Sequence, residues 1–421
     1  MQHSAPARNW VGDNGKIIEP LFADYFLSLH PMRCFLVRLF TVDGMIEDEA
    51  PLKKEIYEQV RYYATTSIAR RIEHIMQAIK LACASEPPEI QTDRIHVRNG
   101  TYFVDGHFTP EKEYCMNRLP IAYVPEAPAP TRWLQFLNEL LYEEDIPALQ
   151  EYIGYCLLPV TKAQKMLLMV GKGGEGKSRI GLILRELFGS SMYTGSLQKV
   201  ETNRFARADL EYKLLLVDDD MKTEALPQTN NIKTLVTLED KIDIERKGQQ
   251  SVQGTLYVRF ACFGNGSLHA LYDKSNGFYR RQLLLTTKEK PVGRVDDPFL
   301  IDKMRGEKEG ILLWALEGLH RLIRNNYQFT ISERTAANLK EAMEQGNNIL
   351  GFLKSERYLE NRQGTKCKST DFYKVYERWC LDNLEKPLAA STFIHHMKDN
   401  QKSLGNIYHY KCNCTKRGFN I

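Results

Sequence analysis

The sequence lacks the long apolar segments that anchor a protein in a membrane or direct its export. No run approaches the roughly 18 consecutive apolar residues of a membrane-spanning helix. The N-terminal residues Met1 to Pro6 contain no apolar signal core. The nine cysteines are scattered and odd in number, which is typical of reduced thiols rather than of a disulfide framework. These absences argue against the membrane and disulfide-rich secreted classes, and we expect a cytoplasmic protein with no membrane partner.

The sequence also has little that could form a metal cluster or a repetitive architecture. Cys412-x-Cys414 is one close pair, and no second pair stands at zinc-site spacing, so a zinc site is not expected. No internal repeat or long low-complexity tract occurs. A hydrophobic content of 43% and a charged content of 26% in 421 residues are those of an ordinary globular chain. This length is sufficient for about two to four domains.

Net charge is small but unevenly distributed. Residues 354–421 contain 13 lysines and arginines against 7 aspartates and glutamates, a net charge of +6. The total is +4, so the rest of the chain carries −2. A basic C-terminal segment is typical of a nucleic-acid-binding surface, but a solvated lysine-rich surface has the same composition. Charge alone leaves both interpretations open.

The most specific motif runs from Gly171 to Ser178 and fits G-x-x-x-x-G-K-[S/T], the phosphate-binding P-loop. Residues 165–170 predict a buried strand before it, and the apolar spacing over 179–188 predicts a helix after it. This order directs backbone N–H groups and a helix N-terminus at a phosphate chain. We expect Lys177 to contact the β- and γ-phosphates of ATP and Ser178 to hold Mg²⁺. The residues expected to bind the nucleotide are Gly171, Gly173, Gly174, Gly176, Lys177 and Ser178.

A second motif places acidic residues at the end of an apolar strand. Residues 214–217 are apolar and lead into Asp218, Asp219 and Asp220. The pattern predicts that Asp218 holds the Mg²⁺ shell and that Asp219 orients or deprotonates the attacking water. Because three aspartates stand in a row, this assignment could move by one position. Without the P-loop upstream, an acidic turn after a strand would be the simpler interpretation.

Two further polar positions follow in series. Asn265 ends the apolar run 258–263, and its amide can both donate to a phosphate oxygen and accept from water. Arg280 and Arg281 precede the apolar run 282–285. A permanently charged guanidinium there suits an arginine finger that reaches the γ-phosphate of a neighbouring subunit, which requires a ring or a dimer. A turn asparagine and a surface arginine pair are the simpler interpretations.

Residues 242–254 alternate on both sides of a Lys247-Gly248 turn and predict a β-hairpin with a basic tip. In a ring, such a hairpin would project into the central pore, where its basic tip would contact DNA phosphates. A solvated charged turn explains the pattern equally well.

This ordered series resembles the superfamily 3 helicases, in particular the helicase half of phage, plasmid and poxvirus primase–helicases. Residues 15–84 and the turn at 98–101 resemble the family's N-terminal module, 127–137 and 149–155 its collar, and 372–380 its C-terminal winged-helix region. The resemblance implies the roles of acidic strand for Asp218 and Asp219 and of sensor for Asn265. It also implies the pore-hairpin base for Lys247, with Arg246 competing, and the arginine finger for Arg281, with Arg280 a close second. Glu175 departs from the pattern, because many members have asparagine there.

The predicted fold is α/β: a P-loop AAA+-type ATPase core with an α+β N-terminal module, a helical collar and a C-terminal winged-helix domain. The expected domains are an N-terminal module over 1–115, a linker and collar over 116–160, the ATPase over 161–330, and a connector with the winged helix over 331–421. Locally, we expect a helical pattern over 54–84 and a hairpin over 95–104 with an Asn99-Gly100 turn. Helices over 371–383 and 390–402 should precede two short strands.

These observations together predict an ATP-dependent DNA helicase ring, expected to be a hexamer, acting at replication initiation of a phage, plasmid or mobile element. Its cofactors would be ATP and Mg²⁺, and its partners single- and double-stranded DNA, further copies of itself and a candidate separate primase. The resemblance implies 3′ to 5′ polarity. Because the chain before Lys165 is assigned to the N-terminal module and collar, we expect no priming activity. The alternatives are an ATP-switched origin-binding initiator or helicase loader and, less favoured, a small-molecule P-loop kinase.

Overall fold

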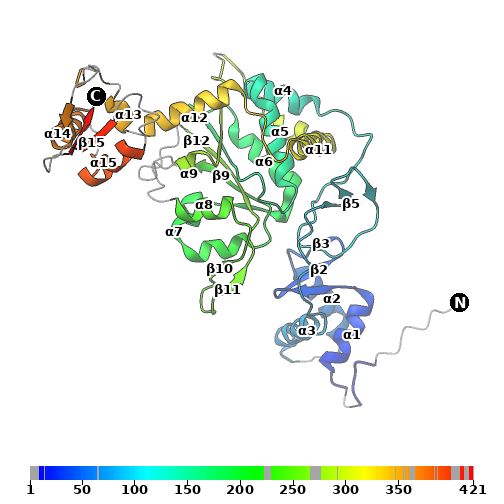
Figure 1. The fold of residues 1–421 in the computed structure, drawn as a ribbon. Helices are drawn as coiled ribbons and strands as arrows, with labels where there is room; N and C mark the ends of the chain where they lie inside the picture. The colour runs from blue at the N-terminus through cyan, green and yellow to red at the C-terminus, as the bar shows by residue number, and fades with distance from the viewer. Residues whose placement is uncertain are drawn as a thin grey trace.

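The computed structural model describes residues 9–421 except 14, 64–65, 222–228, 266–275, 292, 347, 354, 356, 360–365, 384, 386, 400–407, 412–416 and 421. At its centre is a five-stranded parallel sheet in the order β13-β7-β12-β9-β8 (Figure 1). The strands are β7 (Met166–Gly171), β8 (Met192–Thr194), β9 (Leu215–Met221), β12 (Arg259–Asn265) and β13 (Gln282–Thr286). The mixed α/β class predicted from the sequence is therefore confirmed. The strand order reverses direction at β7, which lies between the last strand and the remaining three.

Helices cover both faces of this sheet because its strands are apolar on both sides. In β7, Leu167 and Met169 belong to one buried cluster, whereas Met166, Leu168 and Val170 belong to the other. The first cluster is completed by α4 (Thr131–Leu140), α5 (Ile146–Cys156), α6 (Lys177–Phe188), α10 (Leu300–Arg305) and α11 (Lys308–Arg324). The second is completed by α7 (Leu197–Thr202), α8 (Asn230–Val236) and α9 (Asn276–Tyr279). Both-face burial of a nearly continuous apolar strand is the usual environment of a parallel sheet.

The N-terminal part has a hydrophobic core of its own and lies at the opposite end of the molecule from the C-terminal helices (Figure 1). It contains α1 (Glu19–Leu29), α2 (Ala50–Val60), α3 (Ile68–Ala82) and an antiparallel sheet of β1 (Arg33–Phe35), β2 (Arg38–Thr41) and β3 (Gly44–Met45). The helical pattern over 54–84 is therefore divided between α2 and α3. Ser67, which precedes α3, has a φ of 54° and so cannot continue a right-handed helix.

A second antiparallel sheet comprises β4 (Arg94–Val97), β5 (Gly100–Phe103) and β6 (Phe108–Thr109). The predicted hairpin is present, but its turn is Arg98-Asn99 rather than Asn99-Gly100, because Val97 pairs with Gly100. Glycine is required inside β5 because a Cβ at this position would lie 2.1 Å from the carbonyl oxygen of Thr109. The glycine therefore admits the third strand instead of forming the turn.

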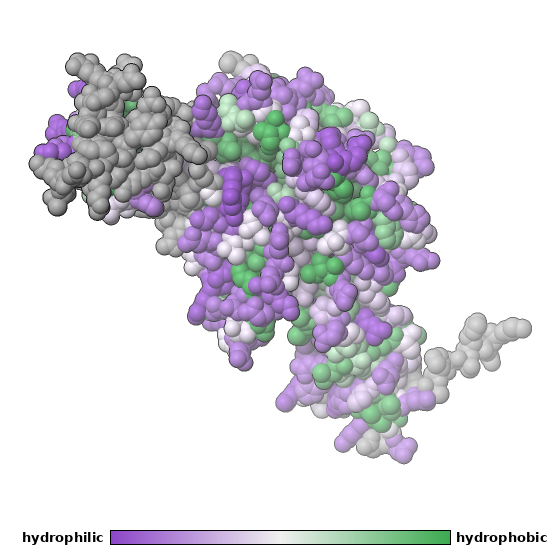
Figure 2. Space-filling view, viewed as in Figure 1, coloured by the Kyte–Doolittle hydropathy of each residue, from purple (hydrophilic) through white to green (hydrophobic). Residues whose placement is uncertain are grey.

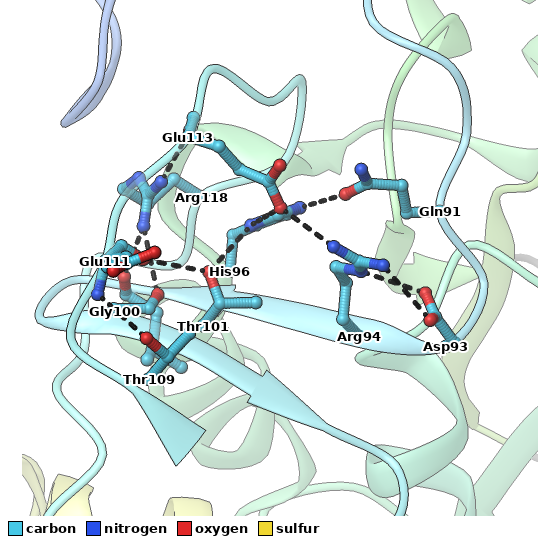
Figure 3. Close-up of polar contacts among 11 residues, drawn as sticks. Gln91, Asp93, Arg94, His96, Gly100, Thr101, Thr109, Glu111, Glu113 and Arg118 are labelled. Carbon is cyan, nitrogen blue, oxygen red and sulfur yellow. Dashed lines mark hydrogen bonds and ion pairs between the residues drawn. The ribbon is translucent and has the colours of Figure 1, made fainter. Parts of the chain in front are cut away.

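A polar network fixes this hairpin (Figure 3). The buried Arg118 guanidinium donates to the carbonyl oxygens of Val97 at 2.7 Å and Gly100 at 3.1 Å. Beside it, the ring of His96 bonds through Nε2 to Gln91 Oε1 at 2.9 Å. Burial and the nearby Arg118 charge lower the pKa of His96 to about 4. The hairpin is thus held by a neutral histidine and by the two terminal nitrogens of a buried arginine.

The C-terminal part begins with the connecting helices α12 (Glu333–Gly346) and α13 (Asn348–Leu353). It continues with β14 (Lys366–Lys368), α14 (Ser369–Asp382), α15 (Ala390–Asp399), β15 (Tyr408–Lys411) and β16 (Arg417–Asn420). The three strands form an antiparallel sheet in the order β14-β16-β15. This order of two helices and two strands agrees with the expected element order, and the winged-helix assignment stays a prediction. Cys412 and Cys414 lie outside the described residues.

Hydrophilic residues cover most of the face seen in Figure 2, and apolar residues on it form several separate patches. Such scattered apolar side chains are normal on a protein surface. Across the described ranges, no helix combines the length and the apolar character needed to cross a membrane.

Candidate functional site

A cavity of about 350 Å³ lies at the carboxyl ends of three adjacent strands, β7, β12 and β9. It therefore sits where the strand order reverses, which is the usual ligand position in open α/β sheets. Its walls come from the loop between β7 and α6, from the ends of β9 and β12, and from the segment after β13. The lining residues are Gly173, Gly174, Glu175, Gly176, Lys177, Ser178, Arg179, Asp219, Asp220, Phe263, Gly264, Asn265, Arg294, Asp296, Asp297 and Leu300.

The glycine-rich loop adopts a conformation that its glycines make possible. Gly173 and Gly176 have φ values of 110° and 117°, a region that other residues rarely occupy. A Cβ on Gly171 would lie 2.2 Å from Thr287 Oγ1 and 2.8 Å from Glu175 Oε1, so glycine is required for the close packing there. Helix α6 begins at Lys177, and its first N–H groups therefore face the cavity. Strand, loop and helix occur in the predicted order.

The interior of the loop holds a carboxylate of the chain itself. Glu175, only 2% exposed, accepts from the Gly173 N–H at 2.7 Å and from Lys177 Nζ at 2.8 Å. Burial raises the pKa of Glu175, but hydrogen bonds from Lys177 and from backbone N–H groups outweigh burial and lower it. Lys177 also donates to Asn265 Oδ1 at 3.3 Å. The loop is therefore an anion site that is filled by an internal anion.

The three consecutive aspartates of β9 do not point the same way. Asp218 is buried, and its Oδ2 accepts from the backbone N–H of Leu197, at the start of α7, at 2.7 Å. Burial raises the pKa of Asp218, and this hydrogen bond opposes the rise. Asp219 instead lies beside Ser178: burial raises the pKa of Asp219, and the Ser178 hydroxyl opposes the rise. Asp219 and Asp220 line the cavity, whereas Asp218 does not.

A β-bulge explains why two successive aspartates reach the same cavity. Along the β12–β9 pair, Cys262 lies opposite Asp218 and Gly264 lies opposite Met221, so β9 contributes one extra residue between them. A bulge interrupts the strict alternation of side chains and re-aims them. The expectation that Asp218 and Ser178 share one metal site therefore does not match this geometry. The acid beside Ser178 is Asp219, one position later.

Asn265 occupies the position expected from its place in the motif series. It is the last residue of β12 and pairs with Gly171 of β7, directly beside the glycine-rich loop. Its amide lies close to Gly173, 3.6 Å from the position of a Cβ there. The structure thus brings Lys177, Ser178, Asp219 and Asn265 together from three strand ends.

The sequence motifs do not include the wall formed by the segment between β13 and α10. Arg294, Asp296 and Asp297 from this segment line the cavity. Lys172 in the glycine-rich loop also forms an exposed ion pair with Glu289 of this segment at 2.5 Å. The segment carries mixed charges without a recognisable spacing, so the sequence did not predict that these residues line the cavity. They do so because the chain passes back over the glycine-rich loop after β13.

We call the side of the sheet where the strands end its carboxyl edge, and the side where they begin its amino edge. Arg280 and Arg281 lie at the amino edge, opposite the cavity. They precede β13, and the carbonyl oxygen of Arg281 accepts from the N–H of Met166, the first residue of β7. Arg280 is exposed, whereas Arg281 is half-buried and donates to the carbonyl oxygen of Gly277. Neither arginine lines the cavity at the carboxyl edge.

The expected hairpin is formed by β10 (Ile242–Ile244) and β11 (Val252–Gly254), which pair in antiparallel fashion. Lys247 is exposed in the connecting turn. Arg246 is half-buried and forms an ion pair with Glu211. The two candidate DNA-binding residues therefore differ in availability: Lys247 is exposed at the surface, whereas Arg246 is paired with Glu211.

Comparison with protein families gives two matches to parts of the chain. Residues 35–141 match the family described as D5 N terminal like. Residues 169–281 match a family of unknown function, DUF5906, over the segment that carries the glycine-rich loop, the acidic strand, Asn265 and the arginine pair. A comparison with curated proteins gave no match.

Similar solved structures cover nearly the whole chain. The A form apo structure of the NrS-1 C-terminal region has a TM-score of 0.53 at 12% identity and matches over 96% of this chain and 99% of that one. A second apo structure of that region, residues 305–718, has a TM-score of 0.54 at 14% identity over the same shares. This likeness shows a shared fold.

Proposed function

We propose that this chain is a Mg²⁺-dependent ATPase that drives a superfamily 3-type DNA helicase ring in the replication of a phage, plasmid or mobile element. The observation that carries this proposal is the convergence of the glycine-rich loop, Lys177, the Ser178–Asp219 pair and Asn265 on one cavity. A nucleotide-hydrolysing site needs a phosphate cradle, a metal position and a water-orienting group together. The match of residues 35–141 to the D5 N terminal like family and the fold shared with the NrS-1 C-terminal region support the replication context.

The residues present fit a phosphate and a magnesium ion. The loop already holds a carboxylate between the Gly173 N–H and Lys177 Nζ, which are also the groups that would bind phosphate oxygens. Mg²⁺ usually takes one or two protein oxygens and completes its shell with water and phosphate. Ser178 and Asp219 would supply these protein oxygens.

Each residue of the cavity then has a role that follows from its position. Bound MgATP would supply the phosphoanhydride that is cleaved. Lys177 neutralises phosphate charge, and Ser178 with Asp219 orients the metal. Asp220, the next carboxylate on the bulged strand, lines the same cavity and is placed to orient or deprotonate the attacking water. Asn265 can donate to a phosphate oxygen once Lys177 has moved toward the ligand.

Arg280 and Arg281 would act on the site of a neighbouring subunit. They lie at the amino edge of the sheet, away from the cavity of their own chain, so a contact with phosphate requires a second copy. Rings in which one subunit supplies an arginine to the next have this arrangement. The proposal therefore includes an oligomer, with a hexamer as the expected form.

The decisive experiment measures the ATPase rate of the full chain with and without single-stranded DNA, together with particle mass in the presence of MgATP. We expect a multi-subunit particle whose hydrolysis increases on DNA, and no hydrolysis by Lys177→Ala. A monomer whose ATPase rate is the same with and without single-stranded DNA would contradict the motor proposal. A DNA-independent ATPase that still forms an oligomer on duplex DNA would instead favour the initiator or loader alternative.

The hairpin provides a second test of the motor. Lys247→Ala should abolish strand displacement while leaving duplex binding and DNA-independent ATP hydrolysis intact, because it removes the exposed cation of the turn. Arg246→Ala is the matched comparison, because Arg246 is already paired with Glu211. Unwinding that survives Lys247→Ala would argue that the hairpin is a solvated charged turn.

A further inference from the structure

The wall contributed by residues 287–300 brings an arginine to the nucleotide cavity from the same chain. Arg294 lines the cavity, and its side chain is 21% exposed. Its Nη2 lies 3.9 Å from the position that a Cβ on Gly176 would occupy. The motif series does not include this residue, and the expected finger arginines lie at the other edge of the sheet.

Arg294 and Asn265 lie near opposite ends of the glycine-rich loop. Asn265 is close to Gly173, whereas Arg294 is close to Gly176, directly before the start of α6. Backbone N–H groups of such a loop cradle the α- and β-phosphates, and the lysine reaches toward the γ-phosphate. Lys177 Nζ is bonded to Asn265, which places the γ-phosphate end of the cavity at Asn265. The guanidinium of Arg294 therefore lies at the other, α/β-phosphate end.

The present partner of Arg294 can release it without leaving a carboxylate unpaired. Arg294 Nη2 is 3.4 Å from Asp296 Oδ1, which is long for a charged hydrogen bond. Asp296 also binds Lys290 Nζ at 2.8 Å. The hydrogen bond from Lys290 is the main reason why the pKa of Asp296 is lowered. Asp296 therefore keeps its closer cation when Arg294 turns to a phosphate.

We propose that Arg294 binds the α/β-phosphate part of the nucleotide within its own subunit. It therefore contributes equally to the affinity for nucleoside diphosphates and for nucleoside triphosphates. This inference rests on the proposed nucleotide site and adds a residue to it. A planar guanidinium is suited to bidentate contact with phosphate oxygens. Because its contact does not involve the γ-phosphate, Arg294 contributes to affinity and leaves the hydrolysis step to the groups around Lys177, Asp219 and Asn265.

The test measures binding of fluorescent N-methylanthraniloyl derivatives of ATP and ADP to the full-length protein in Mg²⁺. Arg294→Ala should weaken both ligands by about tenfold or more, since a hydrogen bond to a charged group contributes about 1.5–3 kcal/mol. The two ligands should lose affinity by the same factor, and kcat at saturating ATP should stay within about threefold. Arg294→Lys should lose less, because it keeps the charge but not the bidentate geometry.

Lys288→Ala is the matched control. It removes a cation from the same segment, but Lys288 donates to the carbonyl oxygen of Asn138 at 2.8 Å and does not line the cavity. We expect unchanged affinity for both ligands. Thermal unfolding without nucleotide checks that each variant folds, and Arg294→Gln replaces Arg294→Ala if the latter does not.

Three outcomes have distinct meanings. Unchanged affinity in folded Arg294 variants overturns the inference. A loss for the ATP analogue alone also overturns it, because Arg294 would then read the γ-phosphate. Failure of the wild-type protein to bind either analogue would count against the proposed nucleotide site itself, a result separable from the behaviour of Arg294.

Discussion

The two edges of the central sheet carry different halves of the proposed machinery. At the carboxyl edge, Lys177 is 7% exposed and is bonded to Glu175 and Asn265, so the chain's own polar groups hold its ammonium group until a ligand binds. At the amino edge, Arg280 is exposed, and Arg281 beside it is half-buried and donates to the carbonyl oxygen of Gly277. One edge holds a pocket, and the other carries an arginine pair.

This difference indicates how the chain divides the work between neighbouring copies. The pocket already brings its donor groups together, although a phosphate must displace the Glu175 carboxylate, whereas an arginine finger gains its effect only when the neighbouring site meets it. In the proposed ring, the amino edge of one subunit would complete the carboxyl edge of the next. The following predictions test this division, beginning with the largest effect.

Arg281→Ala should reduce ATP hydrolysis on the order of 10³-fold or more while leaving nucleotide binding unchanged, because an arginine finger acts on the transition state. Steady-state hydrolysis and equilibrium binding of the same preparations check this. If Arg281→Ala is active and Arg280→Ala is not, the finger is the preceding residue. If Arg281→Ala weakened ATP binding by monomeric subunits, Arg281 would act on the site of its own chain, which would contradict a role across the interface.

Mixed assemblies test the division directly. Lys177→Ala subunits would lack a working pocket but keep the finger, and Arg281→Ala subunits would have the reverse defect. Mixing the two inactive proteins should restore part of the hydrolysis, because some interfaces then combine an intact pocket with an intact finger. No recovery in assemblies shown to be mixed would mean that the two edges do not complete one another.

Asp219→Asn should lower hydrolysis on the order of 10²-fold, because loss of a metal-orienting carboxylate removes several kcal/mol of charge stabilisation. Asp218→Asn is the matched control: its amide oxygen can still accept from the Leu197 N–H, so we expect a smaller loss. Titration with Mg²⁺ should show a weakened metal dependence for Asp219→Asn alone. The reverse ranking would restore Asp218 as the metal residue.

The acidic strand shows why the sequence predicted the site region but not every role within it. Apolar residues before Asp218 indicate a buried strand, and parallel strand ends meet at one edge, so convergence with the P-loop could be predicted. Which aspartate faces Ser178 depends on the bulge between the pairs Cys262–Asp218 and Gly264–Met221. A bulge is set by contacts with the neighbouring strand, and no local pattern specifies it.

Other features had weaker signals or none. The two-residue turn Arg98-Asn99 depends on the approach of Thr109, which excludes a side chain at Gly100. Arg294 reaches the cavity only because the chain returns over the glycine-rich loop after β13. Glu175 differed from the resembling family, and that departure was a signal; its contact with Lys177 appears only in the structure.

Glu175→Gln should tighten nucleotide binding by about tenfold. The carboxylate now occupies the anion site between the Gly173 N–H and Lys177, so a phosphate must displace a charge-assisted interaction of about 1.5–3 kcal/mol. Glutamine has nearly the same shape and leaves Lys177 uncompensated by a buried acid, which increases its attraction for phosphate. Equilibrium binding of ADP and ATP measures the change.

Glu289→Gln is the matched control for this smallest effect. It removes the same charge from the partner of Lys172 in the same loop, but the pair is 78% and 74% exposed, where ion pairs are weak. We expect little change in affinity. Equal tightening by both substitutions would indicate a general electrostatic effect of removing acid near the loop. Weaker binding by Glu175→Gln would mean that the Glu175 carboxylate helps to hold the bound nucleotide instead of competing with it for the Gly173 N–H and Lys177.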